Sequence, residues 1–122
     1  FCRGSMLLYG GTEFAPQHQV GLFDAEDNFG DKRADLQGFL RRCKDMKTSL
    51  PLDGAVWYEV SGGAVIGHYK SPAGERTGVF DLSGCGGRVP VELPDGVYKN
   101  QLGGDLTVTD GHVRTDGDPI VF

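Results

Sequence analysis

Apolar residues follow two different patterns in the first and last parts of the chain. Residues 6–10 form an uninterrupted apolar run closed by glycines, which is typical of a central strand buried on both faces of a parallel sheet. Each parallel neighbour of such a strand needs its own crossover connection. Only one helical pattern follows, and the chain begins with Phe1 rather than Met. We therefore expect the chain to be the last part of a larger protein.

A single helix is predicted from about Asp31 to Ser49. Its narrow apolar stripe recurs at helical spacing and consists of Leu36, Phe39, Leu40, Cys43, Met46 and Leu50. Asp31 is placed to act as the N-cap, because its side chain can accept a hydrogen bond from the first turn. Pro51 marks the end of the helix, because a proline cannot continue it.

After this helix, apolar and polar residues alternate with a period of two, and glycine-rich turns separate the short runs. This pattern predicts antiparallel strands. The predicted strands are Val56–Val60, Ala64–Lys70, Thr77–Leu82, Val89–Leu93, Leu106–Thr109, His112–Thr115 and Pro119–Phe122. Gly62-Gly63 and Asp110-Gly111 are typical of tight hairpin turns, and residues 71–75 are predicted to form a loop.

The strands indicate the fold class of the second part of the chain. Seven or so short strands in about 70 residues are typical of an antiparallel sandwich or barrel. Pro90 places its strand at an edge or a bulge, because proline cannot donate a ladder hydrogen bond. The boundary segment, Leu50–Gly54, is short. We therefore expect residues 1–51 and 52–122 to be two domains that pack together.

Composition limits the classes of partner. The net charge of −5 and the isoelectric point near 5.0 argue against nucleic-acid binding, because such proteins usually present a basic face. No apolar stretch reaches the length needed to cross a bilayer, so we expect no membrane partner. The cysteines, Cys2, Cys43 and Cys85, are odd in number and widely spaced, so they predict no disulfide framework. Reduced thiols favour a cytoplasmic protein, and a signal peptide stays an open alternative.

The cysteines and histidines do not form a recognisable metal site. Cys43 falls on the apolar stripe of the helix and is expected to be a buried, inert thiol. Cys85 stands between two glycines and is expected to be exposed. His18, His68 and His112 have neither mutual spacing nor cysteine partners typical of a metal site. We therefore predict no metal and no cofactor.

Acidic residues near the end of the first strand are the candidates for catalysis. Glu13 with Asp24, Glu26 or Asp27 could supply the two carboxylates that glycoside hydrolysis requires. That role needs burial and a fixed separation, and an acidic loop offers neither. Asp24, Glu26 and Asn28 alternate as calcium ligands do, but the loop lacks the glycine and the bidentate glutamate of a calcium loop. We therefore predict neither catalysis nor calcium binding here.

The aromatic residues of the second domain allow two interpretations. Trp57, Tyr58, Tyr69 and Tyr98 could form a platform for sugar rings, or they could fill the core of a small sandwich. In an alternating strand, Trp57 and Tyr58 point to opposite faces. We therefore expect at least one of these two residues to lie in the core.

Three short motifs, Gly4–Glu13, Leu22–Asp24 and Leu93–Gly104, stand in a particular order along the chain. The first resembles the eighth barrel strand of the α-amylase family of glycoside hydrolases, with Met6 where proline is common. The second is similar to the segment that follows that strand. The third, beginning Leu-Pro-Asp-Gly-Val-Tyr, resembles the family's C-terminal β-domain, often called domain C. The resemblance covers nearly the whole chain.

This resemblance implies a fold and a function. Residues 1–51 would be the last strand–loop–helix unit of a (β/α)8 barrel, and residues 52–122 an antiparallel β-sandwich of the Greek-key type. The parent enzyme would hydrolyse or transfer α-glucosidic bonds in starch or malto-oligosaccharides by a retaining mechanism. The family's three catalytic carboxylates come from the fourth, fifth and seventh barrel strands, which this sequence does not contain. We therefore expect a non-catalytic fragment.

Within that frame, Glu13 would lie at the periphery of the substrate cleft, because active sites lie at the C-terminal ends of barrel strands. The β-domain would be structural and would cover the apolar side of the helix. Expected partners are the missing barrel of the parent chain, an α-glucan, and other copies of the fragment through its uncovered apolar surfaces. The alternative function is a carbohydrate-binding or adaptor β-sandwich with no enzyme attached.

Overall fold

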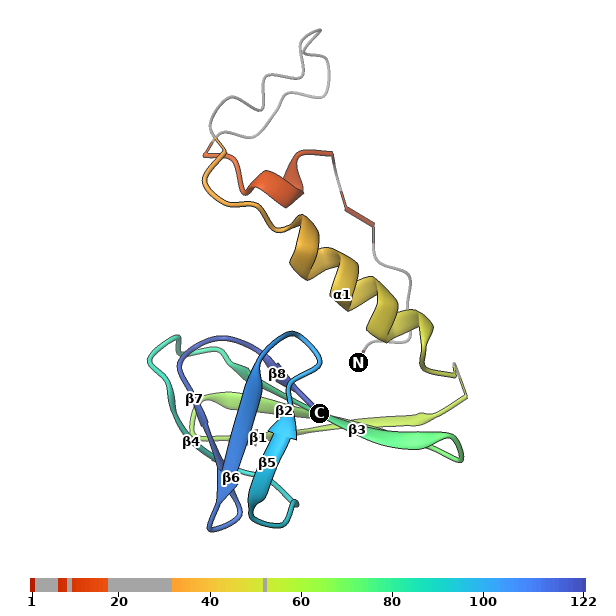
Figure 1. Ribbon diagram of the computed structural model, residues 1–122, viewed down its shortest axis with the longest axis vertical. Helices are drawn as coiled ribbons and strands as arrows, with labels where there is room; N and C mark the ends of the chain where they lie inside the picture. The colour runs from red at the N-terminus through yellow and green to blue at the C-terminus, as the bar shows by residue number, and fades with distance from the viewer. Residues whose placement is uncertain (2–6, 9, 18–31, 52) are drawn as a thin grey trace, which may run out of the picture.

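The computed structural model describes residues 1, 7–8, 10–17, 32–51 and 53–122. In this part of the chain, a short 3-10 helix, η1 (Thr12–Phe14), and one α-helix, α1 (Gln37–Thr48), stand above two packed β-sheets (Figure 1). No helix in the described ranges combines the length and apolar character that crossing a bilayer would require.

Eight strands form two four-stranded sheets. The order in sheet A is β1-β2-β3-β8, and the order in sheet B is β4-β7-β6-β5. The strands of sheet A are β1 (Ala55–Ser61), β2 (Ala64–Ser71), β3 (Gly74–Asp81) and β8 (Ile120–Val121). The strands of sheet B are β4 (Gly87–Pro90), β5 (Gly96–Lys99), β6 (Asp105–Thr109) and β7 (His112–Thr115).

Every pair of neighbouring strands is antiparallel. In sheet B, three consecutive strands form a meander and β4 lies beside the last of them, which is the Greek-key order. The predicted class, a mainly β protein with an antiparallel sandwich and one helix before it, is therefore confirmed. The prediction that Pro90 belongs to an edge strand is also confirmed, because β4 is an outer strand of sheet B.

The core lies between the two sheets and consists of small aliphatic side chains. They alternate along the strands with outward-facing residues, as the packing of two sheets requires. The buried cluster is Ala64, Ile66, Val79, Val89, Val91, Leu106, Val108, Val113 and Ile120. None of these residues belongs to β1. Sheet B therefore covers β2, β3 and β8 and leaves β1, at one edge of sheet A, uncovered.

Both predicted hairpin turns are confirmed. Gly62 and Gly63 have φ values of 56° and 86°, and Asp110 and Gly111 have values of 52° and 67°. Left-handed backbone at both central residues matches the twist of the flanking strands. The Asp95 carboxylate accepts hydrogen bonds from the N–H groups of Asp110 and Gly111 at 3.0 and 3.1 Å. These bonds stabilise the turn and lower the pKa of Asp95.

Three features of the sheets differ from the prediction. The predicted strand Val89–Leu93 is β4, which runs from Gly87 to Pro90 and ends before Val91. The predicted loop at residues 71–75 is a two-residue turn, because Ser71 pairs with Gly74 and its hydroxyl accepts a hydrogen bond from the N–H of Ala73 at 3.1 Å. Strand β5 was not predicted as a separate element. It is only four residues long, and its register comes from pairing with β6 rather than from its own pattern.

The α-helix is shorter than the predicted span of 31–49. The segment before the helix is tied to η1 instead, because the N–H groups of Arg33 and Ala34 bond to Phe14 O and that of Leu36 bonds to Glu13 O at 2.7 Å. The Asp35 carboxylate accepts a hydrogen bond from Gln37 N at 3.0 Å, at the start of α1. The predicted N-cap, Asp31, lies outside the described residues.

The strand predicted at the start of the chain is not formed where the structure can be described. Leu7 and Leu8 belong to no strand and expose 82% and 43% of their surface. All described strand pairs are antiparallel and none involves these residues. A buried parallel strand needs neighbours on both sides, and Leu7 and Leu8 have none among the described residues. Residues 5, 6 and 9 lie outside the described ranges.

Candidate functional site

Glu13 belongs to η1, at the end of α1 that lies farther from the sandwich (Figure 1). Its backbone carbonyl accepts the hydrogen bond from Leu36 described above, and the residue is half-buried. The acidic residues considered with it, Asp24, Glu26 and Asp27, lie outside the described residues, as does Asn28. Among the described residues, no group of three His, Cys, Asp or Glu side chains could hold a metal ion.

The main apolar crevice lies between α1 and the outer face of sheet A. Its volume is about 320 Å³. The helix contributes its predicted apolar stripe, and the sheet contributes aromatic and aliphatic side chains. The lining residues that carry the argument are Phe39, Cys43, Met46, Tyr69, Phe80 and Val121. No residue of α1 is fully buried, so the sheet covers the helix only in part.

Two side chains of sheet A hold the end of the helix. The hydroxyl of Tyr69 donates to the carbonyl of Pro51 at 2.6 Å, and Arg76 Nη1 donates to the carbonyl of Met46 at 3.2 Å. Both acceptors belong to the last turn of α1 or follow it, where carbonyl groups lack a partner in the backbone ladder. The Met46 carbonyl also accepts from Ser49 Oγ at 2.8 Å, so the main effect of the two sheet bonds is to join the helix end to the sheet.

Gly54 leaves the space in which the Tyr69 ring lies. A Cβ atom at position 54 would lie 2.6 Å from the hydroxyl oxygen of Tyr69 and closer still to two of its ring carbons. Both residues are buried. Gly54 is thus fixed by close packing against the tyrosine that binds Pro51 at the end of the helix segment.

Phe1 covers a pair of glycines on the outer face of sheet A. Its ring forms an edge-on contact with Phe80 at 5.7 Å between centroids. A Cβ atom at Gly78 would lie 2.5 Å from Phe1 Cε2, and one at Gly67 would lie 3.2 Å from Phe1 Cγ. The Tyr58 hydroxyl donates to the carbonyl of Phe1 at 2.8 Å. Glycines on β2 and β3 therefore let the first residue pack flat on the sheet.

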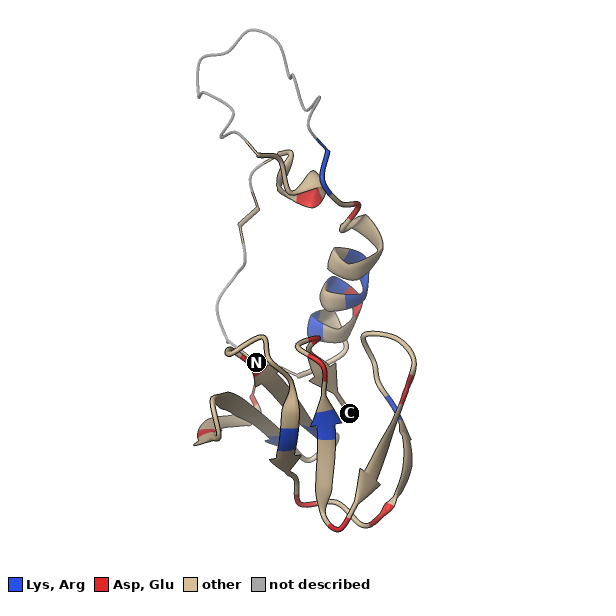
Figure 2. Ribbon diagram, turned by 90° about the vertical axis from the view of Figure 1, so that its left-hand side faces the viewer, with Lys and Arg blue, Asp and Glu red and all other residues tan. Residues whose placement is uncertain are grey.

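Most cationic residues of α1 lie away from the apolar stripe, but Lys47 is half-buried and lines the crevice beside it. Figure 2 shows Lys and Arg residues along the helix, and Arg41, Arg42 and Lys44 are exposed. Cys43, on the stripe, is partly buried, and burial raises the pKa of its thiol. Cys85 is exposed. Cys85 is therefore exposed as predicted, whereas Cys43 is less buried than predicted; Cys2 lies outside the described residues.

Trp57 and Tyr58 correct an expectation, because neither lies in the core. They expose 42% and 53% of their surface. The alternation places them on opposite faces of β1, but β1 is an edge strand that sheet B does not cover. Trp57 stacks on His68 of β2, with ring centroids 4.9 Å apart and planes at 10°. Tyr69 is buried in the crevice below α1, and Tyr98 packs against the edge of the core cluster.

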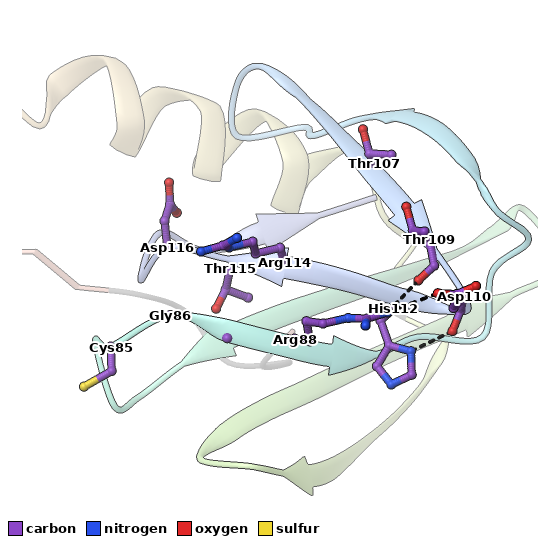
Figure 3. Close-up of a pocket in the computed structure, with 11 residues that line it drawn as sticks. Cys85, Gly86, Arg88, Thr107, Thr109, Asp110, His112, Arg114, Thr115 and Asp116 are labelled. Carbon is purple, nitrogen blue, oxygen red and sulfur yellow. Dashed lines mark hydrogen bonds and ion pairs between the residues drawn. The ribbon is translucent and has the colours of Figure 1, made fainter.

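A second, polar cavity of about 650 Å³ opens on the outer face of sheet B (Figure 3). Arg88 on β4 and Arg114 on β7 face each other across the strands. Arg88 donates to the carbonyl of Thr109 at 3.2 Å and lies 3.7 Å from the carboxylate of Asp110. His112 Nδ1 lies 2.6 Å from the carbonyl of Asp110. These contacts hold the β6–β7 hairpin, so we assign them a structural role.

Asp81 joins the two sheets through the loop that leads from β3 to β4. Its carboxylate accepts hydrogen bonds from the hydroxyl and N–H of Ser83 at 2.6 and 2.9 Å, and from Gly86 N at 2.8 Å. It also accepts one from the buried hydroxyl of Thr115 on β7 at 3.3 Å. The hydroxyl of Ser83 contributes most to lowering the pKa of Asp81.

Sequence reasoning missed the residues that fix the helix to the sandwich, namely Gly54, Tyr69 and Arg76. The only available signal was the buried position of Tyr69 in an alternating strand, and it does not reveal the partner. Asp81 could have been found, because an aspartate two residues before a serine is typical of a local side-chain turn. His68 and His112 lie in strand packing, as expected, and His18 lies outside the described residues.

Comparisons with known proteins agree with this architecture. Residues 58–122 match the family described as "Bacterial Alpha amylase C-terminal domain". The chain is similar to the crystal structure of an alpha-amylase from Lactobacillus plantarum, with 30% sequence identity and a TM-score of 0.81. The similarity covers 98% of this chain and 29% of that chain, so this chain spans less than a third of its length. No curated protein matches the sequence.

Proposed function

The chain belongs to the bacterial α-amylase C-terminal domain family, and on this premise we propose that it forms the structural end of an enzyme acting on α-glucosidic bonds. The proposed substrates are starch-like glucans and malto-oligosaccharides, hydrolysed or transferred with retention of configuration. In this proposal the catalytic carboxylates come from a barrel outside this sequence. The similarity to an alpha-amylase structure supports the proposal.

The observation that carries the structural role is the attachment of α1 to sheet A. Tyr69 and Arg76 bind the carbonyls at the end of the helix, and the apolar stripe meets the sheet across the crevice. The same helix contains no fully buried residue, which leaves apolar surface for a second partner. We propose that this partner is the barrel of the parent chain and that the sandwich fixes the last barrel helix in place.

The test uses the complete protein that carries this sequence, assayed on soluble starch and maltoheptaose. We expect release of reducing sugars, with the new anomeric centre first formed in the α configuration, as proton NMR of early products would show. Gly54→Ala should lower the temperature of half-inactivation and leave kcat unchanged below that temperature. A protein that cleaves β-glucans and spares both α-glucans would contradict the proposed substrate class.

We further propose that Glu13 lies at the rim of the substrate cleft. The support is its place in η1, beyond the end of α1 that lies farther from the sandwich. In the complete protein, Glu13→Gln should raise KM for maltoheptaose more than for maltotriose, because only the longer substrate reaches the rim. Equal KM values for wild type and variant on both substrates would contradict this role.

The alternative is a carbohydrate-binding module without an attached enzyme, which the exposed Trp57 favours. The coding sequence upstream of residue 1 distinguishes the two functions. Several hundred residues with alternating strand and helix patterns and three carboxylates at strand ends would support the enzyme. An upstream sequence without them would contradict the enzyme and support the module.

A further inference from the structure

Trp57 presents one face of its indole ring to the open edge of sheet A. Trp57 on β1 and His68 on β2 are direct cross-strand partners, and their rings stack nearly parallel at 4.9 Å. The stacking direction therefore runs from one strand to the other. Because the imidazole covers the inner face of the indole, the outer face points past β1, which no described strand borders on that side. Trp57 is 42% exposed, which agrees with an uncovered outer face.

This aromatic face is held in a fixed orientation before any ligand binds. The imidazole of His68 is largely buried, with 13% of its side chain exposed, so it gives the indole a firm support. A preoriented aromatic ring loses little conformational entropy on binding, which favours affinity. Surface tryptophans without such support would have to be ordered by the ligand.

The position of Trp57 separates it from the surface that we assign to the barrel. Alternation along β1 places Trp57 and Tyr58 on opposite faces of sheet A. The face of Tyr58 carries Phe1 and the crevice below α1. Packing against the rest of an enzyme on that face would leave Trp57 accessible.

Polar groups suited to sugar hydroxyls surround the exposed indole. Glu59, two residues along the same face of β1, is mostly exposed and has a carboxylate oxygen 3.8 Å from His68 Nε2. Alternate N–H and C=O groups of an edge strand also point outward without a strand partner. A pyranose ring has an apolar face and a rim of hydroxyl groups. The flat indole can stack on the apolar face, and the adjacent donors and acceptors can bind the hydroxyl groups.

We propose that Trp57, supported by His68 and flanked by Glu59, is a binding site for a glucose unit of an α-glucan chain. The choice of ligand rests on the proposed function, because an enzyme acting on starch-like polymers meets such chains. The site holds the polymer at the open edge of the sandwich, remote from η1 and Glu13 at the far end of α1. Its role is attachment to the substrate and not cleavage.

The first experiment uses Trp57 as its own probe. It is the only tryptophan in the 122 residues, so the intrinsic fluorescence of this chain reports on this site alone. We expect maltoheptaose to change the tryptophan emission in a saturable way and cellohexaose to have no comparable effect. An unchanged emission with maltoheptaose, or an equal response to cellohexaose, would overturn the proposal.

The second experiment compares two variants by affinity electrophoresis in gels containing soluble starch. Trp57→Ala should raise the apparent Kd by about tenfold or more, as removal of a central aromatic anchor does at other binding sites. Tyr58→Ala is the matched control, because it removes a somewhat more exposed aromatic from the opposite face of the same strand. Equal retardation of Trp57→Ala and wild type would overturn the proposal.

The outcomes separate this site from the proposed function. If the wild-type complete protein hydrolyses starch while fluorescence and electrophoresis show no role for Trp57, the enzyme assignment stands and the site is refuted. If the protein lacks activity on α-glucans but maltoheptaose still changes Trp57 emission, the site stands and the enzyme assignment fails. Pairing of β1 with another protein strand is the rival use of this edge, and it would produce starch-independent oligomers that persist in Trp57→Ala.

Discussion

The contact between Gly54 and Tyr69 gives the most direct test of how the helix is attached to the sandwich. A methyl group at position 54 would overlap the Tyr69 ring, whose hydroxyl oxygen lies 2.6 Å from the added Cβ. Tyr69 is 5% exposed and its hydroxyl group donates to Pro51 O. The ring therefore cannot move away from position 54 without losing its packing and this hydrogen bond. We expect Gly54→Ala to displace Tyr69 and loosen the end of α1.

The magnitude follows from two contributions. Overpacking a well-packed site costs about 1–3 kcal/mol. Loss of the Tyr69–Pro51 hydrogen bond adds about 1 kcal/mol, so the free energy of unfolding should fall by about 2–4 kcal/mol. Gly38→Ala is the matched control, because its Cβ would meet only Arg42 Nη1, at 3.6 Å. It should stabilise the helix by about 0.5–1 kcal/mol.

Urea denaturation followed by circular dichroism measures both changes, and a double-mutant cycle tests the cause. In a Tyr69→Ala background the added methyl group has room, so Gly54→Ala should then cost less than about 0.5 kcal/mol. Equal stability of Gly54→Ala and wild type would refute the reasoning. An undiminished cost in the Tyr69→Ala background would show that the ring is not the obstacle.

Three other predictions concern the core, the loop carboxylate and the cysteines. Ile66→Ala should lower the free energy of unfolding by about 3 kcal/mol in urea titrations, because it leaves a cavity at a buried position. Asp81→Asn should destabilise the protein at pH 7. Hydrogen bonds, first that from the Ser83 hydroxyl, hold the pKa of folded Asp81 below its usual value. The stabilisation by the Asp81 carboxylate is therefore complete above the pKa of an unfolded aspartate and is lost as the pH falls through the folded pKa. The stability gap between wild type and variant should therefore close as the pH falls through the folded pKa. Iodoacetamide at neutral pH should alkylate the exposed Cys85 before Cys43, whose thiol pKa is raised by burial, as peptide mass spectrometry would show.

Local sequence signals explain which parts of the fold could be predicted. The Asp110-Gly111 turn and the Gly62-Gly63 turn fix their hairpins through backbone geometry that few other residues adopt. Pro90 restricts its strand to an edge, because it lacks the N–H that a central strand needs. In each case the deciding interaction lies within a few residues, so the sequence carries the information directly.

Exposure at an edge could not be predicted in the same way. Trp57 and Tyr58 have the alternation of a strand with one buried face, yet both are exposed because β1 is the outer strand of its sheet. Leu7 and Leu8 have the pattern of a buried strand, yet no described strand pairs with them. A pattern of apolar residues indicates which kind of surface a segment can pack against. Whether that packing occurs depends on which strands and helices lie beside the segment in the folded chain.

The sequence by itself determined the antiparallel class, the helix and its apolar stripe, and the resemblance to the end of an α-amylase, because periodicity and turn residues act over short distances. The tertiary structure alone decided how these parts meet. Gly54 below Tyr69, Phe1 over Gly67 and Gly78, and Trp57 stacked on His68 all join segments that different strands or loops bring together. Such contacts depend on strand order and register, which arise from the packing of the whole chain rather than from any one segment.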